Sequence, residues 1–161
     1  MRHTGFKRGL AALAIALATA GCGAKEMVFG PDDTKIRASI SASDTVNPDL
    51  QGRASPVVVR TYLLRSPTAF QNADFFAVYQ NEAGTLGQDL LERQEFFLEP
   101  GQSLDKEFLL TEDSGATHLG VIAAFRDLDE AQWRQVYAPD LGKTEKIRIT
   151  ADGVRLRIEE Q

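Results

Sequence analysis

The C-terminal segment 144–160 limits the possible folds more than any other part of this sequence, because apolar and polar residues alternate along it. Two alternating runs flank Asp152-Gly153, which is a strong signal for a two-residue hairpin turn. Arg155 and Arg157 occupy the face opposite the apolar one. The apolar positions are Ile147, Ile149, Val154, Leu156 and Ile158. A period of two with one polar face predicts an antiparallel hairpin whose other face packs on a core.

Four other segments carry strand signals. Segment 35–43 alternates strictly, which predicts a half-buried strand. Segment 57–65 is rich in β-branched residues and mostly apolar on both faces, which predicts a more central strand. Segment 118–127 predicts a buried strand, and 95–110 predicts a hairpin with a type II turn at Pro100-Gly101. About seven strands without βαβ alternation predict an all-β, two-sheet β-sandwich and argue against a parallel sheet.

A helical insertion is expected between the early strands, after residue 65. Ser66-Pro67 offers an N-cap followed by a proline in the first turn, and Gly84 is a suitable stop. Segment 85–94 predicts a second short helix or a turn. The aromatic residues that we expect this insertion to bury against a sheet are Phe70, Phe75, Phe76 and Tyr79.

The N-terminal segment 1–21 has the pattern of a secretory signal peptide. Three basic residues precede thirteen residues without a charge, a run too short for a transmembrane helix of roughly 20 residues. Thr19-Ala20-Gly21-Cys22 then resembles the lipobox of bacterial lipoproteins, whose cysteine is acylated. Cys22 is the only cysteine, so a disulfide within the chain is excluded, and a plain signal peptide with a chance cysteine is the alternative.

Lipidation of Cys22 would anchor the chain, because several acyl chains bind a membrane firmly where one binds only marginally. Gly23 rather than Asp follows Cys22, which in bacterial lipoproteins implies sorting to the outer membrane. We therefore expect a signal peptide over 1–21, the lipidated cysteine and a tether over 22–34, and a β-sandwich domain over 35–161.

Composition excludes several function classes. Segment 1–21 takes three of the 18 basic residues and none of the 23 acidic ones, which leaves a net charge of −8 and argues against nucleic acid as a partner. His118 is then the one remaining histidine, so a His/Cys zinc site and Cys–His catalysis are nearly excluded. Nucleophile-elbow, phosphate-loop, HExxH and EF-hand motifs are all missing from the sequence. We expect no enzyme and no cofactor, and we interpret His118 as structural.

Several collinear motifs carry a resemblance to a known family. They are the lipobox, "VNPD" with "SPVVVR" within 46–63, "ADFF" at 73–76, "LEPG" at 98–101 and "GVIAAFRDLDEAQWR" at 120–134. Together they resemble the TssJ (SciN) family, the outer-membrane lipoprotein of the bacterial type VI secretion system (T6SS). The resemblance implies a transthyretin-like β-sandwich with extra helical elements, anchored in the outer membrane by lipid on Cys22 and facing the periplasm.

The resemblance also implies a partner and a site. In this family the lipoprotein binds the periplasmic C-terminal domain of the inner-membrane protein TssM, and thereby joins the membrane complex that also contains TssL. The contact is made by the loop between the first two strands, here residues 44–56. The implied contact residues are Val46, Asn47, Pro48, Asp49 and Leu50. An exposed loop on a rigid sandwich suits binding, whereas the alternative is that 44–56 is only a connector.

Two other interpretations remain open from the residues alone. A periplasmic module that binds a small ligand or carbohydrate would need a concave aromatic site, for which Trp133, Tyr137 and Tyr62 are the candidates. The Arg126-Asp127 pair is either a recognition charge or, as we favour, a strand-end ion pair beside Trp133 with the arginine stacked on the indole.

Overall fold

Alternation along β1 (Thr34–Ala42) fixes which of its faces is buried. Ile36, Ala38 and Ile40 are all at most 2% exposed, while Arg37 between them is exposed. The computed structural model describes residues 33–161, so the signal peptide, Cys22 and most of the expected tether lie outside the described residues. The other strands are β2 (Val57–Leu64), β3 (Leu90–Leu98), β4 (Ser103–Leu110), β5 (His118–Ala124), β6 (Arg134–Tyr137), β7 (Thr144–Asp152) and β8 (Arg155–Glu160).

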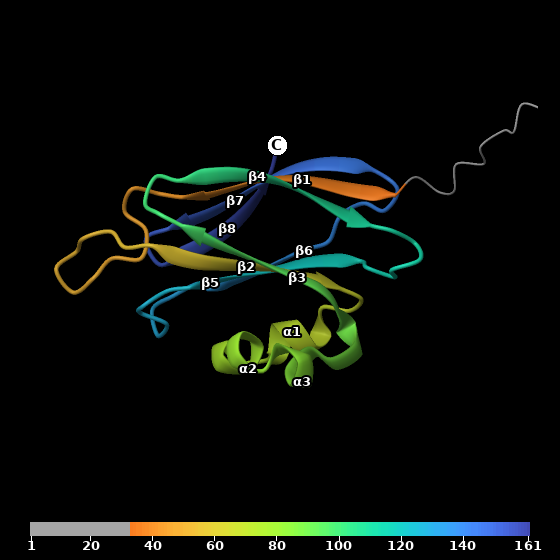
Figure 1. Cartoon of the computed structure of the whole chain (residues 1–161), viewed down its shortest axis with the longest axis horizontal. Helices are drawn as coiled ribbons and strands as arrows, with labels where there is room; N and C mark the ends of the chain where they lie inside the picture. The colour runs from red at the N-terminus through yellow and green to blue at the C-terminus, as the bar shows by residue number, and fades with distance from the viewer. Residues whose placement is uncertain (1–32) are drawn as a thin grey trace, which may run out of the picture.

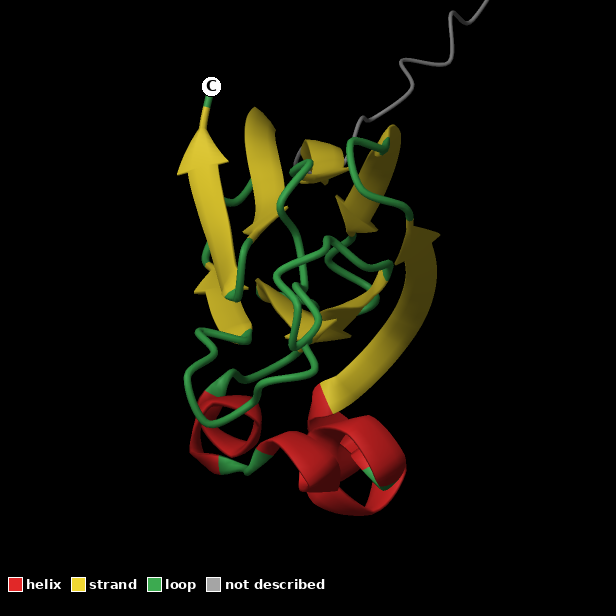
Figure 2. Ribbon diagram, turned by 90° about the vertical axis from the view of Figure 1, so that its left-hand side faces the viewer, coloured by secondary structure: helices red, strands yellow, loops and turns green. Residues whose placement is uncertain are grey.

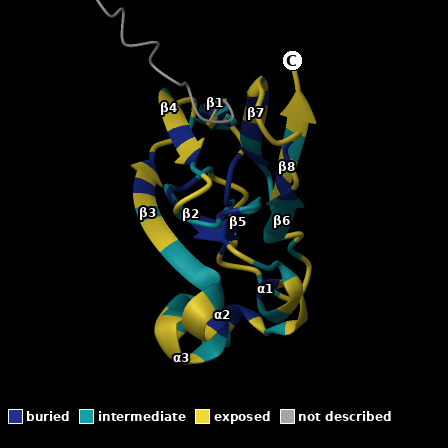
Figure 3. Cartoon of the chain, turned by 90° about the vertical axis from the view of Figure 1, so that its right-hand side faces the viewer, coloured by how far each residue is buried: buried dark blue, intermediate teal, exposed yellow. Residues whose placement is uncertain are grey.

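The strands form two four-stranded sheets packed face to face (Figure 1). One sheet has the order β4-β1-β7-β8 and the other β3-β2-β5-β6, so β2 is central as predicted. Buried residues line the facing surfaces of the two sheets (Figure 3). The predicted two-sheet sandwich is confirmed. Because the main hydrophobic cluster lies within residues 33–161, this part of the chain carries its own core and is expected to fold independently.

The predicted C-terminal hairpin is present. β7 and β8 pair antiparallel and Asp152 is opposite Arg155, with Gly153 at φ 55° in the turn. The predicted turn at Pro100-Gly101 is also present, because Gly101 has φ 78° and the amide of Gln102 donates to the carbonyl of Glu99. The hairpin expected around that turn is wrong. β3 pairs with β2 in one sheet and β4 pairs with β1 in the other, so the connection crosses between the sheets.

Two further expectations about the sheets are corrected. β1 and β7 pair in parallel inside an otherwise antiparallel sheet, and this pairing joins segments that are far apart in the sequence. The structure also has one strand more than the seven expected, because β6 pairs with β5 along residues that have no strong strand pattern.

The predicted single helix is broken into three, α1 (Thr68–Asn72), α2 (Phe75–Gln80) and α3 (Glu82–Leu86), followed by one 3₁₀ turn. Ala73 is extended with ψ 151°, and the Asp74 carboxylate then caps α2 by accepting from the amide of Ala77. Gly84 lies inside α3, and Gly87 with φ 53° ends it. The expected helix or turn over 85–94 gives way to β3 from Leu90 onward.

The three helices gather on the outer face of the β3-β2-β5-β6 sheet (Figure 2). Phe70 and Phe75 are buried there as predicted, but Phe76 is 56% exposed. Two arginines of the sheet attach the helices. Arg134 donates to the carbonyls of Phe70 and Ala73, both at 2.7 Å. Arg60 donates to the carbonyl of Tyr79 at 2.6 Å and lies over its ring.

Candidate partner-binding loop

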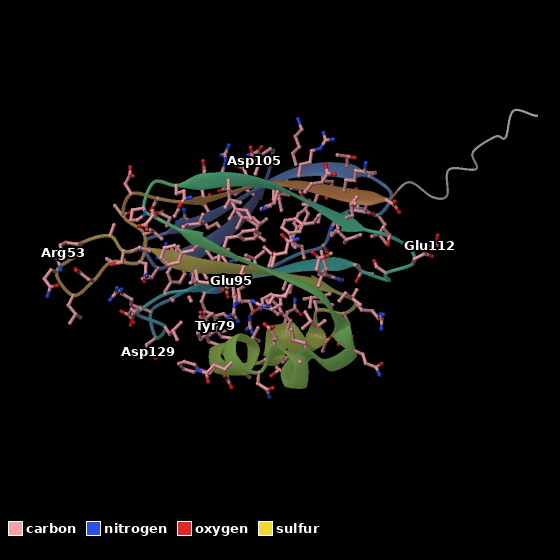
Figure 4. The ribbon with its side chains drawn as sticks, viewed as in Figure 1. Arg53, Tyr79, Glu95, Asp105, Glu112 and Asp129 are labelled. Carbon is pink, nitrogen blue, oxygen red and sulfur yellow. The ribbon has the colours of Figure 1, made fainter. Side chains whose placement is uncertain are left out.

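The loop over residues 44–56 connects β1 in one sheet to β2 in the other and projects from one end of the sandwich. Arg53, near its tip, lies at the far end of the molecule from Glu112 (Figure 4). β1 begins near the Glu112 end, because Thr34 pairs with Leu110. The loop therefore projects away from the end at which the described chain begins.

The base of the loop consists of Val46 and Asn47, and both are part of the folded interior. Val46 is 0% exposed and belongs to the main hydrophobic cluster. Asn47 is 4% exposed and has φ 49°, the one positive φ of a non-glycine residue within 33–161. Asparagine tolerates this left-handed conformation better than most residues, which gives a local reason for its presence.

Asn47 joins three segments by hydrogen bonds. Its backbone amide donates to the carbonyl of Gly153 at 2.7 Å, in the β7-β8 turn. Its side-chain Nδ2 donates to the carbonyl of Pro56 at 2.7 Å, and its Oδ1 accepts from the amide of Arg126 at 2.8 Å. One buried residue, through its backbone amide and its side chain, thus fixes the position of the 44–56 loop relative to both neighbouring loops. A contact role requires accessible surface, so its place in the structure is that of a positioning residue.

The tip of the loop, Asp49–Arg53, is closed by the carboxylate of Asp49. That carboxylate accepts from the amides of Gln51 and Arg53, each at 2.9 Å, and from Arg53 Nε at 2.8 Å. The bonds from the backbone and then the side chain of Arg53 lower the pKa of Asp49 below its usual value of 3.8. Gly52 at φ 78° completes the turn. Sequence reasoning did not identify Arg53, although an aspartate followed by a glycine three residues on is compatible with a turn in which the carboxylate bonds the backbone two residues on.

Leu50 at the tip is fully exposed, with a relative accessibility of 101%. The structure therefore divides the five predicted contact residues into a buried base, a half-buried Pro48 and Asp49, and one exposed apolar side chain. Single exposed leucines are common on protein surfaces. This one is carried on a tip whose backbone is ordered by its own hydrogen bonds.

The expected ion pair between Arg126 and Asp127 is wrong within the described part of the chain. The backbone amide of Arg126 donates to the Asn47 side chain, and the Asp127 carboxylate accepts from the amide of Glu130 at 3.3 Å. The cation over the indole of Trp133 is Arg134 rather than Arg126, with its guanidinium carbon 4.6 Å from the ring centroid. The same guanidinium donates to the carbonyl of Ala73, beside the helices. His118 is half-buried, with Nδ1 2.7 Å from the Thr117 hydroxyl, which agrees with its structural interpretation.

The three aromatic residues considered for a ligand site do not converge on a cavity. Tyr62 is 0% exposed, and burial raises its pKa to about 12. Tyr137 is 9% exposed, and Trp133 packs edge-on against Phe75 at 5.2 Å. Two surface cavities of about 460 and 440 Å³ are lined by other residues.

Over residues 33–161, no three His, Cys, Asp or Glu side chains are grouped so that they could bind a metal ion. No helix in that range is long and apolar enough to cross a membrane.

Comparison with known proteins decides the family. Residues 34–154 match the family model described as type VI secretion lipoprotein, VasD, EvfM, TssJ. The chain belongs to this type VI secretion lipoprotein family. It is 38% identical to the T6SS lipoprotein TssJ1 from Pseudomonas aeruginosa, with a TM-score of 0.77 over 80% of this chain and 97% of that one. Among curated proteins no match was found.

Two more solved structures extend this TssJ likeness. Serratia marcescens Lip, a membrane-bound component of the T6SS, is 27% identical, with a TM-score of 0.72 over 80% of this chain and 98% of that one. A chain from a structure of the T6SS protein TssM C-terminal domain from EAEC is 26% identical, with a TM-score of 0.63 over 78% and 97%. The predicted resemblance to the TssJ family is confirmed, and the chain is a type VI secretion lipoprotein.

Proposed function

We propose that this lipoprotein is a structural adaptor, anchored in the outer membrane and bound to the periplasmic C-terminal domain of TssM through the 44–56 loop. TssL joins the same complex indirectly, through TssM. The carrying observation is Leu50, a fully exposed apolar side chain on a hydrogen-bonded tip. The likeness to a chain from a structure of the TssM C-terminal domain supports TssM as the partner.

The physical argument for the loop is preorganisation. A loop that becomes ordered only on binding loses part of the interaction energy as conformational entropy. Here the Asp49 carboxylate orders the tip, and Asn47 fixes the base against the Arg126 loop and the Gly153 turn. Leu50 then enters an apolar pocket of the partner with little further ordering. Burying one leucine contributes about 1.5–3 kcal/mol, the range of a binding hot spot.

Lipid on Cys22 is the proposed anchor, and Gly23 supports sorting to the outer membrane. The end of the sandwich at which β1 begins would face that membrane, while the 44–56 loop would point toward the partner (Figure 4). Metabolic labelling with a palmitate analogue tests the anchor. We expect label on the full chain and none on the Cys22→Ser variant. Equal labelling of both would contradict the anchor.

The partner is tested by calorimetry. Residues 23–161 are titrated with the TssM C-terminal domain of the same organism, and then the Leu50→Ser variant is titrated. We expect micromolar or tighter binding and a loss of about tenfold or more in the variant. Leu109→Ser is the matched control, because Leu109 is also exposed, at 46%, but lies on β4.

Three results separate the parts of the proposal. Binding that is lost only with Leu50→Ser supports the partner and the site together. Binding that is unchanged by Leu50→Ser would keep the adaptor but place its interface elsewhere. A folded domain that does not bind TssM at all would contradict the adaptor.

A further inference from the structure

A groove of about 440 Å³ opens at the end of the sandwich opposite the 44–56 loop. Its apolar surface comes from Leu110 at the end of β4, Ala116 in the following loop, and Leu141 before β7. Leu141 is 63% exposed, whereas most other leucines within residues 33–161 are buried or half-buried. Asp33 and Thr34 also line the groove, so the described chain begins inside it.

The topology fixes where β1 begins relative to the groove. β1 lies between β4 and β7, with Thr34 opposite Leu110 and Lys35 opposite Thr144. Thr34 Oγ1 accepts from the amide of Gly142 at 2.8 Å. This bond joins the start of β1 to the Leu141-Gly142 side of the groove. The start of β1 therefore lies between the Leu110 side and the Leu141-Gly142 side of the groove.

We propose that the linker residues Met27, Val28 and Phe29 dock in this groove. They are the only large apolar side chains between Cys22 and Asp33. Phe29 is four residues before Asp33, so an extended chain places it at most about 13 Å from that residue. Gly30-Pro31 lies between them and allows the chain to turn. A tethered segment next to its groove also has a high effective concentration, which favours it over a free ligand.

Docking would shorten the tether. This consequence, unlike the docking itself, rests on the proposed lipid anchor at Cys22. Eleven residues from Cys22 to Asp33 reach about 36 Å when extended, whereas seven residues from Cys22 to Phe29 reach about 23 Å. A docked linker would thus hold the groove end of the sandwich nearer to the membrane and keep the 44–56 loop directed away from it.

Thermal unfolding of residues 23–161 tests the docking without lipid or partner. We expect Phe29→Ser to lower the midpoint by about 3 °C and Lys25→Ser, a polar linker control, to leave it unchanged. Leu141→Ser should lower the midpoint of 23–161 but not that of 33–161. Amide exchange over residues 110–117 should be slower in 23–161 than in 33–161.

Equal midpoints of 23–161 with and without Phe29→Ser, together with equal exchange over 110–117, would overturn the proposal. An effect of Phe29→Ser that is independent of Leu141 would also overturn it, because the linker would then dock elsewhere. Neither result bears on TssM binding, which is measured separately.

Discussion

The base and the tip of the 44–56 loop are two or more residues apart in sequence but belong to different parts of the molecule. Val46 and Asn47 are buried, and Asn47 joins the loop to Pro56, Arg126 and Gly153. The Asp49–Arg53 tip makes its side-chain hydrogen bonds within itself and exposes Leu50 completely. A sequence motif that reads as one contact site therefore combines residues that build the loop with residues that can touch a partner.

Asn47→Ala is expected to have the largest effect on stability. It removes the acceptor of the Arg126 amide and the donor to Pro56, and it places alanine at a positive φ. Unsatisfied buried groups cost about 1–3 kcal/mol each, so we expect a loss of about 3 kcal/mol in the free energy of unfolding. Urea denaturation measures it. Asn47→Gly is the control, because it removes the same two hydrogen bonds without the strain of an alanine at positive φ. A loss below about 1 kcal/mol in Asn47→Gly would contradict the positioning role.

Val46→Ala should cost less, about 2 kcal/mol, because it removes two buried methyl groups from the main hydrophobic cluster. The same denaturation series measures it. If Val46→Ala instead weakened TssM binding while the unfolding free energy stayed unchanged, the division between base and tip would fail.

Leu50→Ser should show the opposite profile. We expect a change in unfolding free energy of less than about 0.5 kcal/mol, since the side chain has no burial to lose. Together with the proposed tenfold loss in binding, this would separate the tip from the base in one pair of measurements. If Leu50→Ser destabilised the protein as much as Val46→Ala does, the distinction between the base and the tip of the loop would fail.

The smallest expected effect is the pH dependence of the hydrogen bonds that the Asp49 carboxylate accepts in the tip. The folded-state pKa of Asp49 is lowered, chiefly by Arg53, so its stabilising contribution is fully present above the ordinary pKa of 3.8. That contribution is lost as the pH falls below 3.8 and through the folded value. Amide exchange of Gln51 and Arg53 should therefore accelerate, relative to Asn47, under these acidic conditions. In Asp49→Asn the same amides should exchange faster already at neutral pH.

Local patterns predicted the elements better than their partners. The Asp152-Gly153 hairpin followed from adjacent residues, and so did the turn at Pro100-Gly101. The strands on either side of Pro100-Gly101 nevertheless belong to different sheets. A turn type depends on the dihedral angles of a few adjacent residues. Strand pairing depends instead on which strand has a free edge, and that strand can be far away in the sequence.

The same limit applies to the helices and to the loop. The sequence predicted one helix where the Asp74 cap starts a new one, and the exposure of Phe76 depends on how the short helices lie on the sheet. The sequence predicted where the 44–56 loop lies, but it did not predict that the loop divides into a buried base and an exposed tip. Asn47 has its role because Arg126 and Gly153, from other connections, come within hydrogen-bond distance of it.

By itself, the sequence determined most of the segments that become strands, because a period of two is set by backbone geometry and by the removal of apolar side chains from water. The strand β6, which has no such pattern, is the exception. The sequence also determined the family, through motifs spread along the chain in one order. The tertiary structure decided the parallel pairing of β1 with β7, the crossing from β3 to β4, and the separation of Asn47 from Leu50. Each of these depends on contacts between residues distant in sequence, which exist only once the two sheets have packed.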